Sequence, residues 1–233
     1  MGHRSLTRPT GPRHDFCRAF LVLVAIVWAA ACGTEEQLRA ERLLDPDHSV
    51  WSMPAPDSFD ILVASTKGDF VMRAWRNWAP IGVDRLYQLA RHGFYDDSRF
   101  YRIRAGFIAQ FGIPGDPDVT RAWAGRTLPD DPVRESNTRG TYAYAMTGPD
   151  TRTTQIYINY ADNSRLDADG FAPLGRIIEG MEVVDRLYAE YDETSGGGMR
   201  GGQQGPLLEF GNAYLDREYP NLDRLIRATV IPY

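Results

Sequence analysis

The stretch that decides the fold is Phe100–Gly112, which reads FYRIRAGFIAQFG. Its apolar residues fall in two short runs, which predict strands over Arg99–Ile103 and Phe107–Phe111 with a glycine-bearing turn between them. Two arginines, Arg102 and Arg104, lie two residues apart on the first run, and a strand therefore places both on one face. The stretch thus combines a pair of short strands with two charges in an otherwise apolar segment.

Further strands of similar length flank this pair on both sides. Phe59–Ser65 and Phe70–Trp75 lie on either side of a short connection that contains a glycine, and together they predict a hairpin. The other strand candidates are Thr141–Met146, Gln155–Asn159 and Leu174–Ile178. Their short lengths and close intervals are typical of an antiparallel sheet rather than of alternating strands and helices.

Helical patterns are confined to two segments. Apolar residues recur at helical spacing over residues 81–90, with Pro80 near the start and Gly93 after the end, as helix termini prefer. Met181–Tyr191 shows the same spacing, whereas residues 115–132 are rich in proline and aspartate and predict a long ordered loop. Many short strands and few helices indicate a mainly β domain, either a barrel or a sandwich.

The composition excludes several classes of protein. The 233 residues are 43% hydrophobic and carry a formal net charge of -5, from 26 basic and 31 acidic residues. These proportions are typical of a globular domain with its own core, and they exclude a disordered tail or a multi-span membrane protein. The acidic balance gives no reason to expect a nucleic-acid partner. Two cysteines and four histidines leave little basis for a metal site or a disulfide framework.

The N-terminus has the layout of an export signal. Arginines precede an unbroken apolar run over residues 19–31, which is too short to span a bilayer as a lone helix and ends in small residues. Residues 1–31 therefore predict a signal peptide, and the sequence around Cys32 resembles a bacterial lipoprotein box. Lipidation of Cys32 would anchor the chain at the cell envelope, with residues 32–57 as a polar tether. An ordinary cleaved signal and an uncleaved anchor are the alternatives.

A glycine-rich tract, SGGGMRGGQQG, occupies residues 195–205. A phosphate-binding loop needs a preceding strand, a following helix and usually a Gly-Lys-Ser/Thr ending, and the tract has none of these. We therefore interpret it as a mobile surface loop. The sequence also contains no Gly-x-Ser-x-Gly, His-Glu-x-x-His or Cys-x-x-Cys motif, which leaves hydrolase and redox chemistry without support.

Three ordered blocks resemble the cyclophilin-type peptidyl-prolyl isomerases. Phe100–Gly112 is similar to that family's Phe-His-Arg-Ile-x-x-Gly-Phe-(Met/Val)-x-Gln-Gly-Gly signature, and residues 145–158 and 166–184 contain the other two blocks. The resemblance implies that residues 58–233 form a closed eight-stranded antiparallel barrel capped by two helices, with a closing strand near Ala228–Ile231. Residues 206–226 resemble an insertion of secreted bacterial members, in which we expect a helical cap over Gly211–Glu218.

The resemblance also implies the residues of the site. Arg102 takes the position of the catalytic arginine, and Gln110 is expected to orient it, whereas Arg104 is interpreted as a solvated charge. The implied substrate-binding residues are Phe107, Ile108, Gln110, Ala145, Met146, Gln155, Tyr157, Leu166 and Phe171. No cofactor and no metal is implied. For the aromatic residues core packing is the alternative, because alternate strand residues point into a barrel regardless of function.

Several positions depart from the pattern of better-known eukaryotic members. Phe171 stands where they usually carry histidine, and Arg165 where they carry a tryptophan at the pocket rim. Tyr157 replaces phenylalanine, Ile108 replaces methionine, and Phe111 stands where glycine is more frequent. All but Arg165 preserve an apolar pocket floor, so the isomerase interpretation is unaffected.

The function implied is the cis-trans isomerisation of X-Pro bonds in exported proteins, which assists their folding. The two isomers of an X-Pro bond are close in energy, so a catalyst has only to lower the rotational barrier and needs neither nucleophile nor metal. Two alternatives are a non-catalytic module that binds proline-containing polypeptides and a holdase chaperone at the cell envelope. A pure binder has no need for the donor of Arg102, which favours the enzyme. We expect a monomer.

Overall fold

The computed structural model describes residues 1–2, 36–196 and 204–231. It divides into two compact units, Met1–Glu41 and Arg42–Tyr233, and the second contains the sheet. Residues 36–43 are helical, and within the described residues no helix has both the length and the apolar character needed to cross a bilayer. Most of the predicted signal peptide, Cys32 and residues 197–203 of the glycine-rich tract lie outside the described residues.

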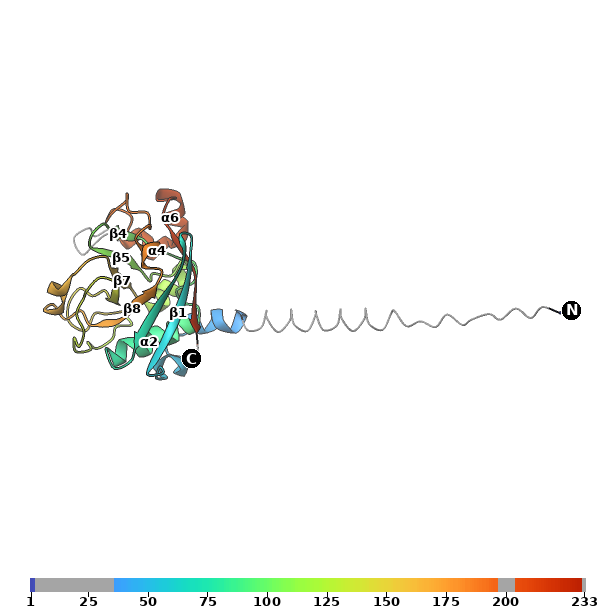
Figure 1. The fold of residues 1–233 in the computed structure, drawn as a ribbon, viewed down its shortest axis with the longest axis horizontal. Helices are drawn as coiled ribbons and strands as arrows, with labels where there is room; N and C mark the ends of the chain where they lie inside the picture. The colour runs from blue at the N-terminus through green and yellow to red at the C-terminus, as the bar shows by residue number, and fades with distance from the viewer. Residues whose placement is uncertain (3–35, 197–203, 232–233) are drawn as a thin grey trace. The chain divides into compact units, whose positions relative to one another are not determined.

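One antiparallel sheet dominates the second unit (Figure 1). Its strands are β1 (Ser58–Ser65), β2 (Gly68–Trp75), β3 (Ser98–Arg99), β4 (Arg102–Arg104), β5 (Ile108–Phe111), β6 (Thr141–Tyr144), β7 (Ile156–Asn159), β8 (Pro173–Glu179) and β9 (Arg224–Ile231). They are paired in the order β3-β9-β1-β2-β8-β6-β7-β5-β4. The predicted hairpin is confirmed as β1 and β2, and in β2 the alternate residues Phe70, Met72 and Ala74 face the core. The mainly β prediction is therefore confirmed.

The closed eight-stranded barrel is not confirmed, because the described sheet has nine strands and an open order. The difference lies at Arg99–Ile103, which the sequence predicts as one strand. The chain pairs with β9 through Ser98–Arg99, and the backbone N–H of Phe100 then donates to the Asp223 carbonyl. It pairs with β5 only from Arg102 onward. Thus the two end strands of the curled sheet, β3 and β4, are joined by the chain itself.

The first predicted helix is confirmed as α2 (Pro80–Arg91), whereas the second is shorter than predicted. Helix α4 covers only Met181–Val184 of the predicted 181–191. The backbone N–H groups of Arg186 and Leu187 bond three residues back rather than four, and that of Tyr188 then donates to the carboxylate of Asp223, so the helix is not resumed. Residues 115–132, predicted as a loop, contain α3 (Pro117–Trp123), which has Asp116 as a side-chain cap and proline in its first turn.

Two helices follow the described part of the glycine-rich tract. Helix α5 (Gln204–Phe210) was not predicted, whereas α6 (Asn212–Glu218) confirms the helical cap expected over Gly211–Glu218. Both pack through leucines against Tyr101 and Ile113 in a hydrophobic cluster separate from the main core. Figure 1 shows α6 at the end of the sheet opposite α2. The implied insertion is therefore a packed part of the domain.

The main core also receives the end of the segment predicted as a polar tether. A short helix, η1 (Ser49–Ser52), places Trp51 in this core with 8% of its surface exposed. Its ring packs edge-on against Trp123 of α3 at a centroid distance of 5.0 Å. The indole N–H donates to the Asp45 carbonyl at 2.7 Å. Residues around Trp51 are thus anchored to the domain, unlike a simple flexible spacer.

Candidate functional site

A pocket of about 680 Å³ opens over β4, β5 and β7, which lie side by side in Figure 1. Every residue that the sequence assigns to the site in the domain lines this pocket: Arg102, Phe107, Ile108, Gln110, Ala145, Met146, Gln155, Tyr157, Leu166 and Phe171. Arg104, Arg165 and Glu193 also line it. Residues as far apart in the sequence as Arg102 and Gly205 therefore meet in one concave surface.

Strand register explains why three polar and aromatic residues meet at the centre of the pocket. Gln110 of β5 is paired with Arg102 of β4 on one side and with Tyr157 of β7 on the other. Directly paired residues on neighbouring antiparallel strands point to the same face of the sheet. The side chains of Arg102, Gln110 and Tyr157 consequently form a row across the three strands.

The pocket floor is apolar. Ile108, Tyr157 and Leu166 form a small buried cluster, against which the partly exposed Phe107 and Phe171 pack. The rings of Tyr157 and Phe171 meet edge-on at a centroid distance of 5.8 Å. This cluster is separate from the main core and faces the pocket. Its members therefore provide a surface for an apolar ligand group as well as internal packing.

The guanidinium of Arg102 is held from two sides. Its Nη1 donates to Oε1 of Gln110 at 2.9 Å, and its Nε donates to Oε1 of Glu193 at 3.1 Å. Nη2 also donates to the Glu193 carboxylate, and only 11% of the Arg102 side chain is exposed. The expected contact between Gln110 and Arg102 is therefore present. A guanidinium fixed in this way keeps one orientation without substrate.

Sequence reasoning missed Glu193. This residue follows α4 by several turns and precedes the glycine-rich tract, so no strand register or motif connects it with Arg102. Its carboxylate also lies 3.5 Å from Nη1 of Arg104, whose side chain is 53% exposed. Arg104 is thus largely solvated, as the sequence predicts, although it shares an acidic neighbour with Arg102.

A chain of amide and hydroxyl groups continues behind Arg102. Gln110 donates through Nε2 to Oε1 of Gln155 at 3.0 Å, and the Tyr101 hydroxyl donates to the same oxygen at 2.6 Å. Burial raises the pKa of Tyr101, so this hydroxyl stays protonated and remains a donor. The amide of Gln204, from α5, lies 3.3 Å from that of Gln155. The insertion thereby contributes to the polar network of the pocket.

The hydroxyl of Tyr157 has a buried partner that the sequence gave no reason to expect. It donates to Oδ1 of Asn137 at 2.8 Å, while Nδ2 of Asn137 donates to Oδ1 of Asp167 at 2.8 Å. Burial raises the pKa of Tyr157 and would also raise that of Asp167. Hydrogen bonds from Ser136 and Asn137 outweigh burial and lower the pKa of Asp167. Asn137 therefore fixes the ring of Tyr157 against the pocket floor.

Within the described part of the chain, no group of three or more His, Cys, Asp or Glu side chains is placed to hold a metal ion. The chemistry that the pocket itself offers is a fixed cationic donor beside an apolar floor. Such a site can bind a small apolar ring and stabilise electron density that develops next to it.

The site thus combines a curled antiparallel sheet with an apolar-floored pocket that is separate from the main core. Residues 59–200 match the family described as cyclophilin type peptidyl-prolyl cis-trans isomerase/CLD. The chain therefore belongs to this family of isomerases.

Two named relatives agree with this assignment, and a solved structure shares the fold. A peptidyl-prolyl cis-trans isomerase of Acinetobacter baylyi is 34% identical over 125 residues, which are 52% of this chain and 66% of that protein. Peptidyl-prolyl cis-trans isomerase A of Dickeya dadantii is 31% identical over 153 residues, 61% of this chain and 77% of that protein. A crystal structure of a Cryptosporidium parvum cyclophilin type isomerase shares the fold, with a TM-score of 0.55 and 17% identity over 76% of this chain and 99% of that chain.

Proposed function

We propose that this chain catalyses cis-trans isomerisation of X-Pro bonds in exported polypeptides and so assists their folding. The observation that carries the proposal is the guanidinium of Arg102, fixed between Gln110 and Glu193 at the edge of an apolar pocket. A monomer is sufficient for this activity, because every group used in the proposal comes from one chain.

The physics of the reaction matches this arrangement. Rotation about a peptide C–N bond has to break amide resonance, which presents a barrier of about 18–20 kcal/mol. At the twisted transition state the prolyl nitrogen becomes pyramidal and regains a lone pair. A donor fixed beside that nitrogen stabilises the twisted state more than either planar state, and only such differential binding increases the rate. Arg102 supplies the donor.

The remaining pocket residues bind the substrate. The proline ring packs on Phe107, Ile108 and Leu166, and Tyr157 and Phe171 close the pocket around it. The extended peptide runs along Ala145 and Met146, which directly follow β6, with Gln155 beside it. Met146 is only 9% exposed, so its main effect is on the shape of the pocket rather than on direct contact with the peptide. An apolar, enclosed environment strengthens the hydrogen bond from Arg102 because it excludes water.

A proline-isomerisation assay on the purified protein tests the proposal. Accelerated relaxation of an Ala-Pro tetrapeptide is expected, because the donor and the apolar floor are already in place. Binding of the same peptide without acceleration would instead assign the chain to the non-catalytic modules. Suppression of aggregation of a proline-free client, with no effect on isomerisation, would assign it to the holdase chaperones.

The location of the protein is part of the proposal and rests on the sequence of the first 32 residues. If Cys32 carries the lipid, Cys32→Ser should abolish incorporation of labelled palmitate in bacteria that express the full chain, since no thiol remains at the acylation site. Cys17→Ser is the matched control and should keep the label, because Cys17 lies within the cleaved segment. A Cys32→Ser variant that is still labelled would contradict lipid anchoring at this residue.

Glu193 offers a test of how firmly Arg102 has to be held. We expect Glu193→Ala to lower kcat about three- to tenfold with little change in KM, because loss of the charge-assisted hydrogen bonds frees the guanidinium to move while Gln110 still holds Nη1. Glu193→Gln keeps an acceptor and should recover part of the loss. Asp169→Asn removes one charge from the same pocket and is expected to leave kcat within about twofold. Equal kcat in parent and Glu193→Ala would show that Gln110 alone positions Arg102.

A further inference from the structure

The pocket rim carries a cationic group that the isomerisation mechanism does not use. Arg165 belongs to a short helix, η2 (Ser164–Asp167), and its guanidinium carbon lies 4.7 Å from the ring centroid of Phe107. Arg104 approaches the same ring, at 5.9 Å. Both arginines line the pocket. Phe107, on which the proline ring is proposed to pack, is therefore flanked by two guanidinium groups.

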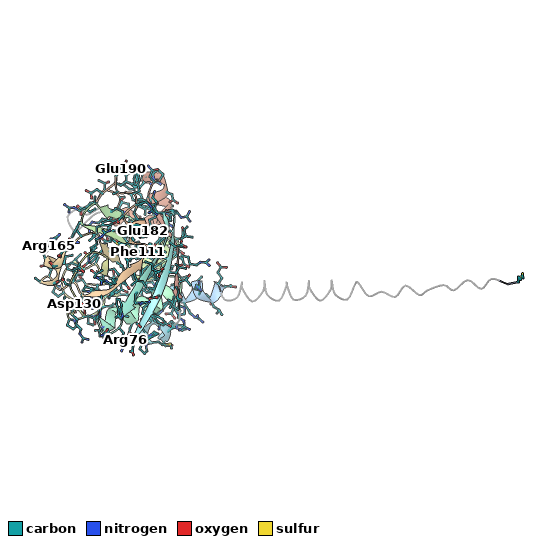
Figure 2. The ribbon with its side chains drawn as sticks, viewed as in Figure 1. Arg76, Phe111, Asp130, Arg165, Glu182 and Glu190 are labelled. Atoms are coloured by element: carbon teal, nitrogen blue, oxygen red, sulfur yellow. The ribbon has the colours of Figure 1, made fainter. Side chains whose placement is uncertain are left out.

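Arg165 is an exposed side chain, and Figure 2 shows it at the outer edge of the domain. Within the described residues it forms no ion pair, whereas Arg102 and Arg104 share Glu193. Its guanidinium lies over the ring of Phe107, and within the same residues it donates no hydrogen bond. Stacking on an aromatic ring restrains a guanidinium and leaves its edge with the N–H donors available. The edge of Arg165 is thus oriented at the mouth of the pocket.

The charge around the mouth contrasts with that of the whole chain. The full sequence has a formal net charge of -5, but the described residues of the pocket lining include three arginines, Arg102, Arg104 and Arg165, against two acidic residues, Glu193 and Asp169. A concave surface with a local excess of one charge attracts the opposite charge and repels its own. A carboxylate in a bound peptide would meet the planar fork of Arg165 in the geometry that guanidinium groups bind best.

We propose that Arg165, with Arg104 beside it, forms a rim subsite that binds an acidic side chain next to the substrate proline. The proposal rests on the proposed isomerase function and adds a substrate preference to it. Peptides with Glu or Asp directly before or after the proline are the favoured class, and peptides with Lys at the same position are disfavoured. Arg102 keeps its role toward the prolyl nitrogen.

The test is a comparison of kcat/KM among tetrapeptides that differ only at the residue before or after the proline. At low salt the purified protein should turn over at least one Glu peptide about fivefold faster than its Lys counterpart, and the ratio should fall toward one at 0.5 M salt. The Ala peptide measures isomerisation itself. Absence of turnover for all peptides would refute the proposed function, whereas equal turnover of the Glu and Lys peptides would refute only the subsite.

Two substitutions test whether Arg165 causes the preference for Glu peptides over Lys peptides. Arg165→Glu should reverse the Glu-to-Lys ratio, because the charge at the mouth of the pocket changes sign. Arg227→Glu is the matched control: Arg227 is an exposed arginine of β9, which pairs with β1 on the opposite side of the domain in Figure 1. It introduces the same change in net charge and should leave the ratio unchanged. A ratio unaffected by Arg165→Glu, or moved equally by Arg227→Glu, would overturn the subsite.

Discussion

Replacing Arg102 with alanine is expected to lower kcat/KM for an Ala-Pro peptide by about tenfold or more, with the fold intact. Removal of one preorganised donor from an enzyme site typically costs about 3 kcal/mol of transition-state stabilisation, and each 1.4 kcal/mol is about a factor of ten in rate. Tenfold is therefore a lower bound. The loss should fall on kcat more than on KM, because the donor acts on the twisted state and the planar substrate still packs on Phe107 and Leu166.

Arg104→Ala is the matched control for this prediction. It removes the same side chain two residues along the same strand, but Arg104 is half exposed and its contact with Glu193 is longer. We expect less than a threefold change in kcat/KM for the Ala-Pro peptide. Circular dichroism should show the native fold in both variants. Full activity of Arg102→Ala would show that catalysis does not depend on the donor of Arg102.

The part of the site that could be predicted from the sequence is the part set by strand register. Arg102, Gln110 and Tyr157 come from short strands whose pairing follows from alternation and from the family blocks, and the structure brings them together as expected. Glu193 and Asn137 could not be found in this way. Each reaches the site from an irregular segment, where backbone direction depends on tertiary hydrogen bonds rather than on a local periodicity.

The elements of the fold also separate into those that local sequence patterns predict and those that distant hydrogen bonds determine. The hairpin β1–β2 and helix α2 follow from local patterns of apolar residues, and both are confirmed. The course of the chain after α4 was not predictable, because the N–H of Tyr188 bonds to Asp223, which is far away in the sequence. The break between β3 and β4 depends on the same region, since Phe100 bonds to Asp223. Local propensity is a weak guide wherever a distant residue supplies a better hydrogen-bond partner.

The second large prediction concerns the buried ion pair of Arg152 and Asp131; Thr151 and Thr153, on either side of Arg152, line the pocket. Arg152 is 1% exposed, and its Nη1 donates to Oδ2 of Asp131 at 3.1 Å, while Nη2 donates to the Pro129 carbonyl. Asp131 also accepts the backbone N–H groups of Ile81 and Gly82 at 3.0 and 2.8 Å. It therefore caps the N-terminus of α2, where Ala79 offers no side-chain cap, and joins that helix to the segment that leads into the pocket.

Asp131→Ala should destabilise the protein by about 3–5 kcal/mol, because it leaves the Arg152 charge buried and without its innermost partner. It also leaves the positive end of the α2 dipole beside the guanidinium of Arg152 with no carboxylate between them, and the lost cap adds about 1 kcal/mol. Urea unfolding measures the change. Asp118→Ala, which removes an exposed pair with Arg121 on α3, should cost less than about 1 kcal/mol.

If Asp131→Ala does not yield folded protein, the free energy of unfolding can be measured for Asp131→Asn instead. Asparagine can still accept one backbone N–H of α2 through its carbonyl oxygen, but it carries no charge to balance Arg152. An intermediate loss of about 2–3 kcal/mol is therefore expected, because hydrogen bonding survives and ionic compensation does not. Oδ1 of Asp130 lies 3.1 Å from Nε of Arg152. If the loss of unfolding free energy were as small as that of Asp118→Ala, Asp130 alone would balance the buried charge. Asp130 would then stabilise the segment around Arg152, and Asp131 would stabilise only the N-terminus of α2.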